Sequence, residues 1–317
     1  MVIESNAEQR RDLEVQLVHD LDHTSEAVKC LAFSPNGKYI ATGGAAGAAV
    51  FEVSTGRLKQ VLKSTKHFPS SENNCVNGIC FYFDNEMIIT AWRDGCIKLW
   101  DFHSNTIMHI FVGHEGAISS IDIQHSGRYL VSGGRDDETV RVWDMVTRQL
   151  KGTVKFKGLV LSVSLSPDGR YVAAASINAP IIVFDILDGI TVARTEPNLY
   201  EEYVWWGRSM ADCRRLYSAH LDKTRVKLWD LYSSQCLRTF DGHNGCVTCA
   251  IVTSDSKWLI AGTEHSTLQL WNPDTGELFG AFKAHQRTVT CVGACQPNLF
   301  ASGSSDGTVK IWRYLPN

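Results

Sequence analysis

One pattern returns seven times along this 317-residue chain and constrains its fold more than any other feature. Each copy is a short apolar segment that carries an aromatic residue close to its end. The copies lie at 48–53, 96–101, 139–144, 180–185, 225–230, 267–272 and 308–313. Their aromatic residues recur every 41–49 residues and are Phe51, Trp100, Trp143, Phe184, Trp229, Trp271 and Trp312. Such a regular period indicates stacked repeats, because one repeat cannot bury its apolar face alone.

The repeats also share an internal order of strand-like segments. An apolar segment such as AISSIDI (117–123) leads to a turn that contains Asn-Gly, Ser-Gly or Asp-Gly, as at 36–37, 126–127 and 168–169. Glycine suits these hairpins because it tolerates a positive φ. A period of about 40–45 residues is typical of the four-stranded blade of a propeller. The sequence therefore predicts an all-β, seven-bladed propeller in which residues 1–317 form a single domain.

A ring of blades must be closed where its two ends meet. After the last aromatic segment, which ends at Arg313, only YLPN follows, which is too short for an outer strand. The segment LEVQLVHDL at 13–21 is strand-like and belongs to no repeat. We expect it to act as a clasp strand that completes the last blade and protects a sheet edge. Residues 1–12 are expected to form a flexible N-terminal tail.

These motifs resemble WD repeats over the whole chain. The family's blade carries a hydrogen-bonded set of His, Ser or Thr, Asp and Trp, whose buried polar groups satisfy one another. Two repeats match the full set. In the third repeat the set is His114, Ser132, Asp137 and Trp143, and in the seventh it is His285, Ser302, Asp306 and Trp312.

Other repeats match this set only in part. The second has Thr90, Asp94 and Trp100 without an evident histidine. The fourth has Ala174, Asn178 and Phe184, and the sixth has His243, Ala261, His265 and Trp271 at the corresponding positions. We therefore expect all seven blades to form, with uneven stability.

Candidate catalytic motifs fit structural roles better. Ser305 lies in a Gly-x-Ser-x-Gly sequence, but that motif needs a strand–turn–helix setting, and here it falls in a hairpin loop. The pair Cys246 and Cys249 falls in a predicted strand, where residues three apart point to opposite faces, so the cysteines are expected to be small core residues. The sequence predicts no catalytic residues, no bound metal and no cofactor, and hence a protein that is not an enzyme.

Charge and hydropathy limit the classes of partner. The formal net charge is −3, and the lysine and arginine residues are scattered singly, so we expect no direct nucleic-acid binding. No apolar run reaches the 18 or so residues of a membrane helix, and the polar start MVIESNAEQRRDLE is no secretory signal. We expect no membrane association and no small-molecule substrate, which leaves proteins as the partners.

The resemblance implies that two positions in each blade face a partner. The first lies just inside the first strand of the blade: Lys29, Asn77, Ser119, Leu161, Trp205, Thr248 and Thr290. The second immediately precedes the Asp position: Arg93, Asp136, Ile177, Leu221, Glu264 and Ser305. Leu161, Ile177, Trp205 and Leu221 suggest an exposed apolar patch on the fourth and fifth blades, and Trp205 and Arg93 are the leading hot-spot candidates. Burial of Trp205 between blades is the alternative.

The first third of the chain resembles one branch of the family more specifically. The segment at 15–58 has an LDHTS start, an ATG second strand and a blade without the usual Asp, as in the C-terminal propeller of fungal Tup-type, Groucho-related corepressors. This resemblance implies a nuclear adaptor that docks sequence-specific DNA-binding repressors and other corepressor subunits. The alternative function is that of a scaffold or substrate receptor in another complex, such as a ubiquitin ligase or a signalling assembly. The alternative location is the cytoplasm.

Overall fold

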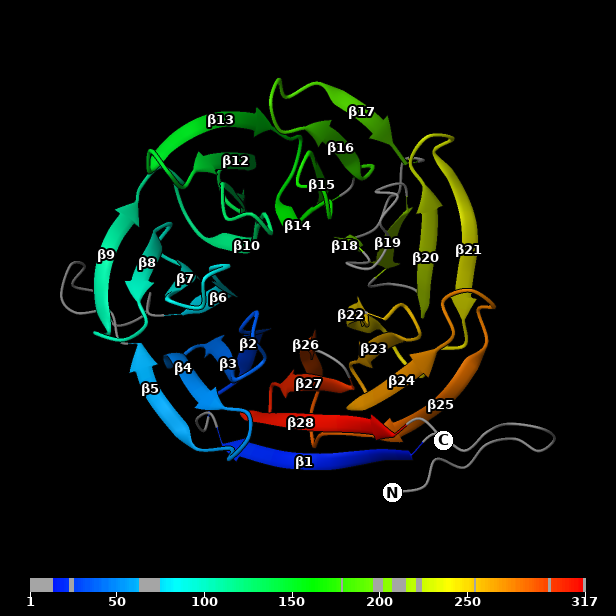
Figure 1. Ribbon diagram of the computed structural model, residues 1–317. Coiled ribbons are helices and arrows are strands. Elements are labelled where there is room, and N and C mark those ends of the chain that lie inside the picture. Colours follow the sequence, from blue (N-terminus) through cyan, green and yellow to red (C-terminus); the bar gives the residue numbers. More distant parts are fainter. Residues whose placement is uncertain are drawn as a thin grey trace.

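Seven antiparallel sheets of four strands each stand around a central axis in the computed structural model (Figure 1). The structure describes residues 14–22, 26–62, 75–177, 179–195, 202–206, 215–220, 224–253, 255–295 and 298–315, with the backbone alone for 202–206 and 220. The predicted seven-bladed propeller is confirmed.

The strands of each blade follow one another from the inner to the outer edge of the ring. The first blade comprises β2 (Val28–Phe33), β3 (Tyr39–Gly44), β4 (Gly47–Glu52) and β5 (Leu58–Leu62). The second comprises β6 (Val76–Phe81), β7 (Met87–Trp92), β8 (Ile97–Asp101) and β9 (Thr106–Phe111). The third comprises β10 (Ile118–Ile123), β11 (Tyr129–Gly134), β12 (Thr139–Asp144) and β13 (Gln149–Lys155). The fourth comprises β14 (Val160–Leu165), β15 (Tyr171–Ser176), β16 (Ile182–Asp185) and β17 (Thr191–Arg194).

The remaining blades keep the same order. The fifth comprises β18 (Glu202–Trp206), β19 (Arg215–His220), β20 (Arg225–Asp230) and β21 (Gln235–Asp241). The sixth comprises β22 (Val247–Val252), β23 (Leu259–Thr263), β24 (Thr267–Trp271) and β25 (Leu278–Lys283). The seventh comprises β26 (Val289–Cys295), β27 (Leu299–Ser304), β28 (Thr308–Leu315) and, from the start of the chain, β1 (Glu14–Asp22).

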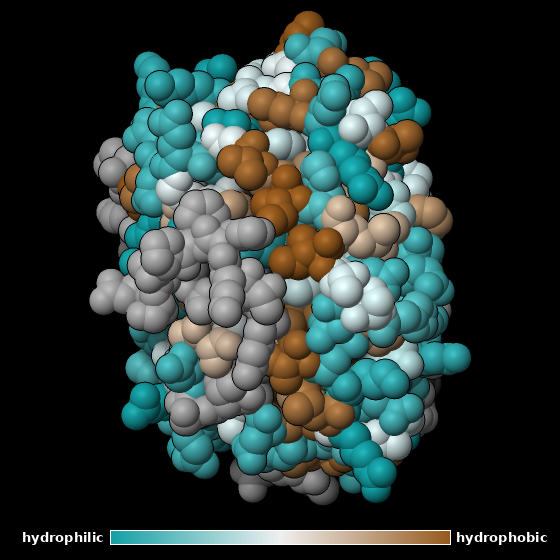
Figure 2. Space-filling view, turned by 90° about the vertical axis from the view of Figure 1, so that its left-hand side faces the viewer, coloured by the Kyte–Doolittle hydropathy of each residue, from teal (hydrophilic) through white to brown (hydrophobic). Residues whose placement is uncertain are grey.

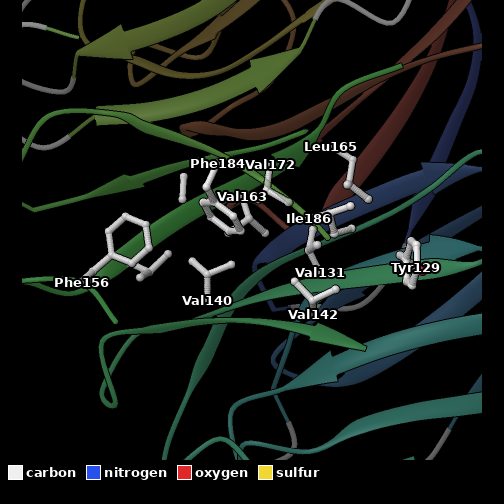
Figure 3. Packing of buried hydrophobic residues seen from close by; sticks show 12 residues of the cluster. Tyr129, Val131, Val140, Val142, Phe156, Val163, Leu165, Val172, Phe184 and Ile186 are labelled. Atoms are coloured by element: carbon white, nitrogen blue, oxygen red, sulfur yellow. The ribbon is translucent and has the colours of Figure 1, made fainter. Parts of the chain in front are cut away.

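Apolar side chains between neighbouring blades form the core. The strands in the middle of a blade are buried almost throughout, because the sheets on either side cover both of their faces. Figure 3 shows one such layer, in which Val131 and Val142 of the third blade face Val163 and Val172 of the fourth. The predicted turn glycines Gly37, Gly127 and Gly169 have φ values of 69°, 75° and 68°, a region that favours glycine.

The ring closes where β1 pairs antiparallel with β28, so that residues from the two ends of the chain lie side by side (Figure 1). This strand begins and ends one residue later than the 13–21 expected from the sequence. Val15 and Leu21 of β1 are buried, with only 3% and 4% of their surface exposed. Val15 lies in the core cluster between the sixth and seventh blades, and Leu21 in the cluster between the seventh and first. Within the described ranges, no helix is long and apolar enough to cross a membrane.

Candidate functional site

A ring of polar side chains joins the first strands of neighbouring blades around the central channel. Asn77, Ser119, Thr248 and Thr290 occupy the same position on β6, β10, β22 and β26. Each donates a hydrogen bond to a backbone carbonyl on the next blade, and the acceptors are Ile118 (2.8 Å), Val160 (2.7 Å), Val289 and Val28 (2.5 Å) respectively. These residues, expected to face a partner, therefore also hold adjacent blades together.

Two residues at this position differ from the rest of the ring. Leu161 on β14 has no hydrogen-bonding side chain and is 9% exposed. Lys29 on β2 is exposed, and its Nζ lies 3.4 Å from Oδ1 of Asn77 on the second blade. Lys29 thus brings a positive charge to a position where the other described blades carry neutral side chains.

The mouth of the channel is a cavity of about 700 Å³ beneath the loops of one face. Eight of the residues predicted to face a partner line it: Lys29, Asn77, Arg93, Ser119, Asp136, Leu161, Thr248 and Thr290. Ala117, Arg135 and Thr288 complete the lining. We refer to these eleven residues as the mouth.

The second set of predicted residues is placed by a repeated backbone hydrogen bond. The residue that follows the second strand donates its N–H to the carbonyl of the loop leading into the blade, as Arg93 does to Cys75 (2.9 Å). In the third blade the residue that makes this bond is Arg135, which donates to Ala117 (2.8 Å). The sequence prediction named Asp136, the residue before Asp137. It missed Arg135 because the loop of the third blade holds one extra residue. Counting forward from the end of the strand would have found Arg135.

Other predicted residues do not line the mouth. Ile177, Glu264 and Ser305 donate the same backbone bond in the fourth, sixth and seventh blades, but the cavity does not include them. The side chain of Trp205 and the whole of Leu221 lie outside the described residues. The apolar patch therefore stays a prediction, of which the structure describes a buried Leu161 and a half-buried Ile177.

The seventh blade contains a continuous chain of buried hydrogen bonds. The indole N–H of Trp312 donates to Ser302 Oγ (2.9 Å), which lies 2.7 Å from Nε2 of His285. On the other side of the imidazole, Nδ1 lies 2.9 Å from Thr308 Oγ1, and Thr308 donates to Asp306 (2.6 Å). Because Thr308 gives its hydroxyl proton to Asp306, it accepts from the Nδ1–H of His285, and in the neutral imidazole Nε2 then accepts from the Ser302 hydroxyl.

The third blade carries a similar chain, in which the carboxylate contacts the histidine directly. Trp143 Nε1 donates to Ser132 Oγ (2.8 Å), which lies 2.6 Å from His114 Nε2, and His114 Nδ1 lies 2.8 Å from the Asp137 carboxylate. Both complete sets predicted from the sequence are thus placed in single networks. Each network fixes the loop that leads into a blade against the strands of that blade.

Two blades replace missing partners with residues outside the predicted sets. In the second, the indole N–H groups of Trp92 and Trp100 both donate to Thr90 (2.7 and 2.8 Å), so a second tryptophan takes part where a histidine is absent. In the fourth, Phe156, Ala174 and Phe184 lie in one apolar cluster (Figure 3). Phe156 precedes Ala174 by the same interval that separates His114 from Ser132. This spacing could have identified Phe156 as the residue at the histidine position of the fourth blade.

The sixth blade lacks both the serine and the aspartate of the network. His243 Nδ1 is hydrogen-bonded to Gln269 Oε1, but Ala261 stands where the serine would be. His243 Nε2 and Trp271 Nε1 are buried and have no hydrogen-bond partner among the described residues. Two polar atoms are therefore unsatisfied around one missing hydroxyl.

The buried histidines make folding sensitive to acid. Burial lowers the pKa of His243 and of His285 to about 4, despite the acceptors beside their Nδ1 atoms. Burial lowers the pKa of His114 as well. Although burial opposes it, hydrogen bonds from Thr308 and from the Gln286 backbone lower the pKa of Asp306 to about 2.

We expect the free energy of unfolding to decrease as the pH falls from about 6.5 to about 4. In the unfolded chain a histidine takes up a proton near pH ~6.5. In the folded chain His243 and His285 do so only near a pH of about 4. The unfolded state then binds more protons, so stability present above this window is lost within it, by on the order of a few kcal/mol. Urea unfolding across the window tests this. The double variant His243→Gln/His285→Gln should show a flatter profile, and a wild-type midpoint that does not change would contradict the expectation.

The outer side of the ring differs from the mouth. Figure 2 views the side formed by the outer strands of the first three blades, where apolar side chains form an interrupted band among hydrophilic ones. Leu58 on β5, Met108 on β9 and Leu150 on β13 are exposed there. Among the described residues, no group of three or more His, Cys, Asp or Glu side chains could hold a metal ion.

The repeats assign the chain to a family. The sequence model of the family described as "WD domain, G-beta repeat" matches residues 15–48, 61–101, 105–144, 234–272 and 276–313. The chain therefore belongs to the WD40 repeat family, and its fold is the seven-bladed propeller of that class. The fourth blade and the first three strands of the fifth lie between the matched ranges, and the fourth is the blade whose polar set is replaced by Phe156, Ala174 and Phe184.

Curated relatives narrow the resemblance. The transcriptional repressor rco-1 of Neurospora crassa is 33% identical over 98% of this chain and 54% of its own length. A WD repeat-containing protein 26 homolog of Arabidopsis thaliana is 26% identical over 92% of this chain and 49% of its own length. The COMPASS component SWD3 of Saccharomyces cerevisiae is 23% identical over 90% of this chain and 95% of its own length. The chain spans about half the length of the first two relatives.

Proposed function

We propose that this chain is a non-catalytic adaptor of transcriptional repression, whose mouth and surrounding loops dock DNA-bound repressors in the nucleus. One observation carries the proposal. Eight of the residues that the resemblance assigns to the partner-facing surface, from six of the seven blades, line a single cavity. The similarity to a fungal transcriptional repressor over nearly the whole chain supports the same function. Partners would be sequence-specific DNA-binding repressors and other corepressor subunits.

The chemistry of the mouth favours binding over catalysis. Its serine, asparagine and threonine side chains on the first strands donate to backbone carbonyls, so none is arranged as a nucleophile beside a base. The buried histidines are neutral members of structural networks. A rigid cavity with a few exposed charges at its rim suits the recognition of a peptide segment.

A second candidate is a subunit of another nuclear assembly. SWD3, a COMPASS component, is matched over 95% of its own length, so a protein of this size acts there as one part of a complex. Such a subunit would use the same face for different partners. A scaffold or receptor in a ubiquitin ligase or signalling complex is the further alternative.

Affinity capture from nuclear extract separates these candidates. We compare the wild-type chain with Arg93→Glu/Glu264→Arg, which reverses two exposed charges at equivalent backbone positions and leaves the net charge unchanged. The matched control, Lys59→Glu/Asp274→Lys, makes the same exchange at exposed positions outside the mouth. We expect DNA-binding repressors to be captured by the wild-type and control chains and lost with the first variant. Capture of ubiquitin-ligase or COMPASS subunits without any DNA-binding repressor would overturn the proposal.

A further inference from the structure

The charges of the mouth are unevenly distributed, and they indicate which partner it fits. Lys29, Arg93 and Arg135 come from three consecutive blades, the first to the third, and all three are exposed. None forms an ion pair with a described carboxylate. The one carboxylate in the lining, Asp136, accepts a hydrogen bond from the Ala117 backbone (2.8 Å). One side of the mouth therefore carries three positive charges against one negative charge.

The neutral polar groups of the mouth offer little to a ligand. Ser119 and Thr290 already donate their hydroxyl protons to carbonyls of the next blade, and the Asn77 amide does the same. Leu161 contributes an apolar surface. Recognition by the described lining must therefore rely mainly on its cations, whose long side chains can reach a ligand without disturbing the bonds between blades.

We propose that this side of the mouth binds an acidic peptide segment, rich in aspartate or glutamate, through Lys29, Arg93 and Arg135. Arginine and lysine at the rim of a cavity steer and orient a carboxylate-bearing partner. The three cations occupy one side of a mouth and do not form the extended basic stripe that a nucleic acid requires. The inference rests on the proposed function, since it specifies the chemistry of the segment that a docked regulator presents.

Fluorescence anisotropy with a labelled peptide of alternating glutamate and aspartate tests the proposal. The triple variant Lys29→Gln/Arg93→Gln/Arg135→Gln should weaken binding about tenfold or more, because it removes every unpaired cation of the lining. The matched control Lys59→Gln/Lys155→Gln/Lys283→Gln removes the same charge from exposed positions on outer strands and should change affinity less than about twofold. The corresponding asparagine–glutamine peptide should not bind measurably.

Several results would overturn the inference. The wild-type chain could show no saturable binding of the acidic peptide, or could bind the asparagine–glutamine peptide equally well. It could also bind only a peptide that carries phosphoserine, or bind single-stranded DNA of the same charge more tightly. An equal loss of affinity in the triple variant and in its control would also overturn the inference. If the peptide assay fails while Arg93→Glu/Glu264→Arg still abolishes capture of repressors, the acidic inference is wrong and the proposed function stands. If the wild-type chain captures no repressor, the proposed function itself fails.

Discussion

Removal of residues 1–22 should lower the melting temperature by roughly 10 °C or more. The deletion takes away β1, and with it the hydrogen-bonded partner of β28. Val15 and Leu21 are buried at 3% and 4% exposure, and burial of two such side chains contributes about 3–6 kcal/mol. The outer edge of the seventh blade would also be left open, which exposes the unpaired backbone groups of β28. Differential scanning calorimetry of the two chains measures the effect.

Point variants within β1 separate the clasp from a mere change in length. Val15→Asp and Leu21→Asp should each destabilise the fold by about 2–4 kcal/mol, because each places a carboxylate in an apolar cluster. Leu17→Asp is the matched control on the same strand, where the side chain is 48% exposed, and it should change stability by less than about 0.5 kcal/mol. Equal effects at Leu17 and Leu21, or a deletion that leaves the melting temperature unchanged, would show that β1 does not close the ring.

The second large effect concerns the hydroxyl that the sixth blade lacks. Ser302→Ala should destabilise the chain by about 2–4 kcal/mol, since it leaves both Trp312 Nε1 and His285 Nε2 without a partner. Ala261→Ser should have the opposite sign and stabilise by about 1–3 kcal/mol, because one serine hydroxyl can accept from Trp271 and donate to His243. Equilibrium unfolding in urea measures both changes.

The fourth blade provides the control for this pair. Ala174→Ser places the same hydroxyl between Phe156 and Phe184, where no described polar side chain of the set remains to satisfy it. We expect this substitution to destabilise the protein by about 1–3 kcal/mol. If serine stabilised the fourth and sixth blades alike, a general effect of serine would account for the result better than the unsatisfied atoms of His243 and Trp271.

The fold could be predicted from the sequence because each blade repeats the same order of strands and turns. The number and order of the blades are indicated by aromatic residues at 41–49-residue spacing and by turn glycines such as Gly37 and Gly169. The two complete polar sets could be predicted as well, since Asp137 and Asp306 each precede their tryptophan by six residues and the serine and histidine positions shift by only one or two residues between the two repeats. Such features depend on short-range spacing, which a sequence displays directly.

What could not be predicted depends on contacts between blades. Ser119 and Thr290 share a position in the repeat, but only the structure shows that their hydroxyls reach the neighbouring blade. Trp92, in contrast, could have been found, because residues two apart in a strand share a face and its indole therefore lies on the side of Thr90. Arg135 was missed because an extra residue in its loop shifts the count from Asp137. Predicted partner-facing positions thus include residues that are first of all structural.

Replacing the matched part of Neurospora crassa rco-1 with this chain tests the central claim most directly. In a strain that lacks the native repressor, transcription of a gene that rco-1 represses is measured with the chimera, with its Arg93→Glu/Glu264→Arg variant and with its Lys59→Glu/Asp274→Lys control. We predict that the chimera and the control restore repression and that the first variant does not, at equal protein levels. Failure of the chimera to repress, or full repression by the Arg93→Glu/Glu264→Arg variant, would contradict a repressor-docking face at the mouth of the propeller.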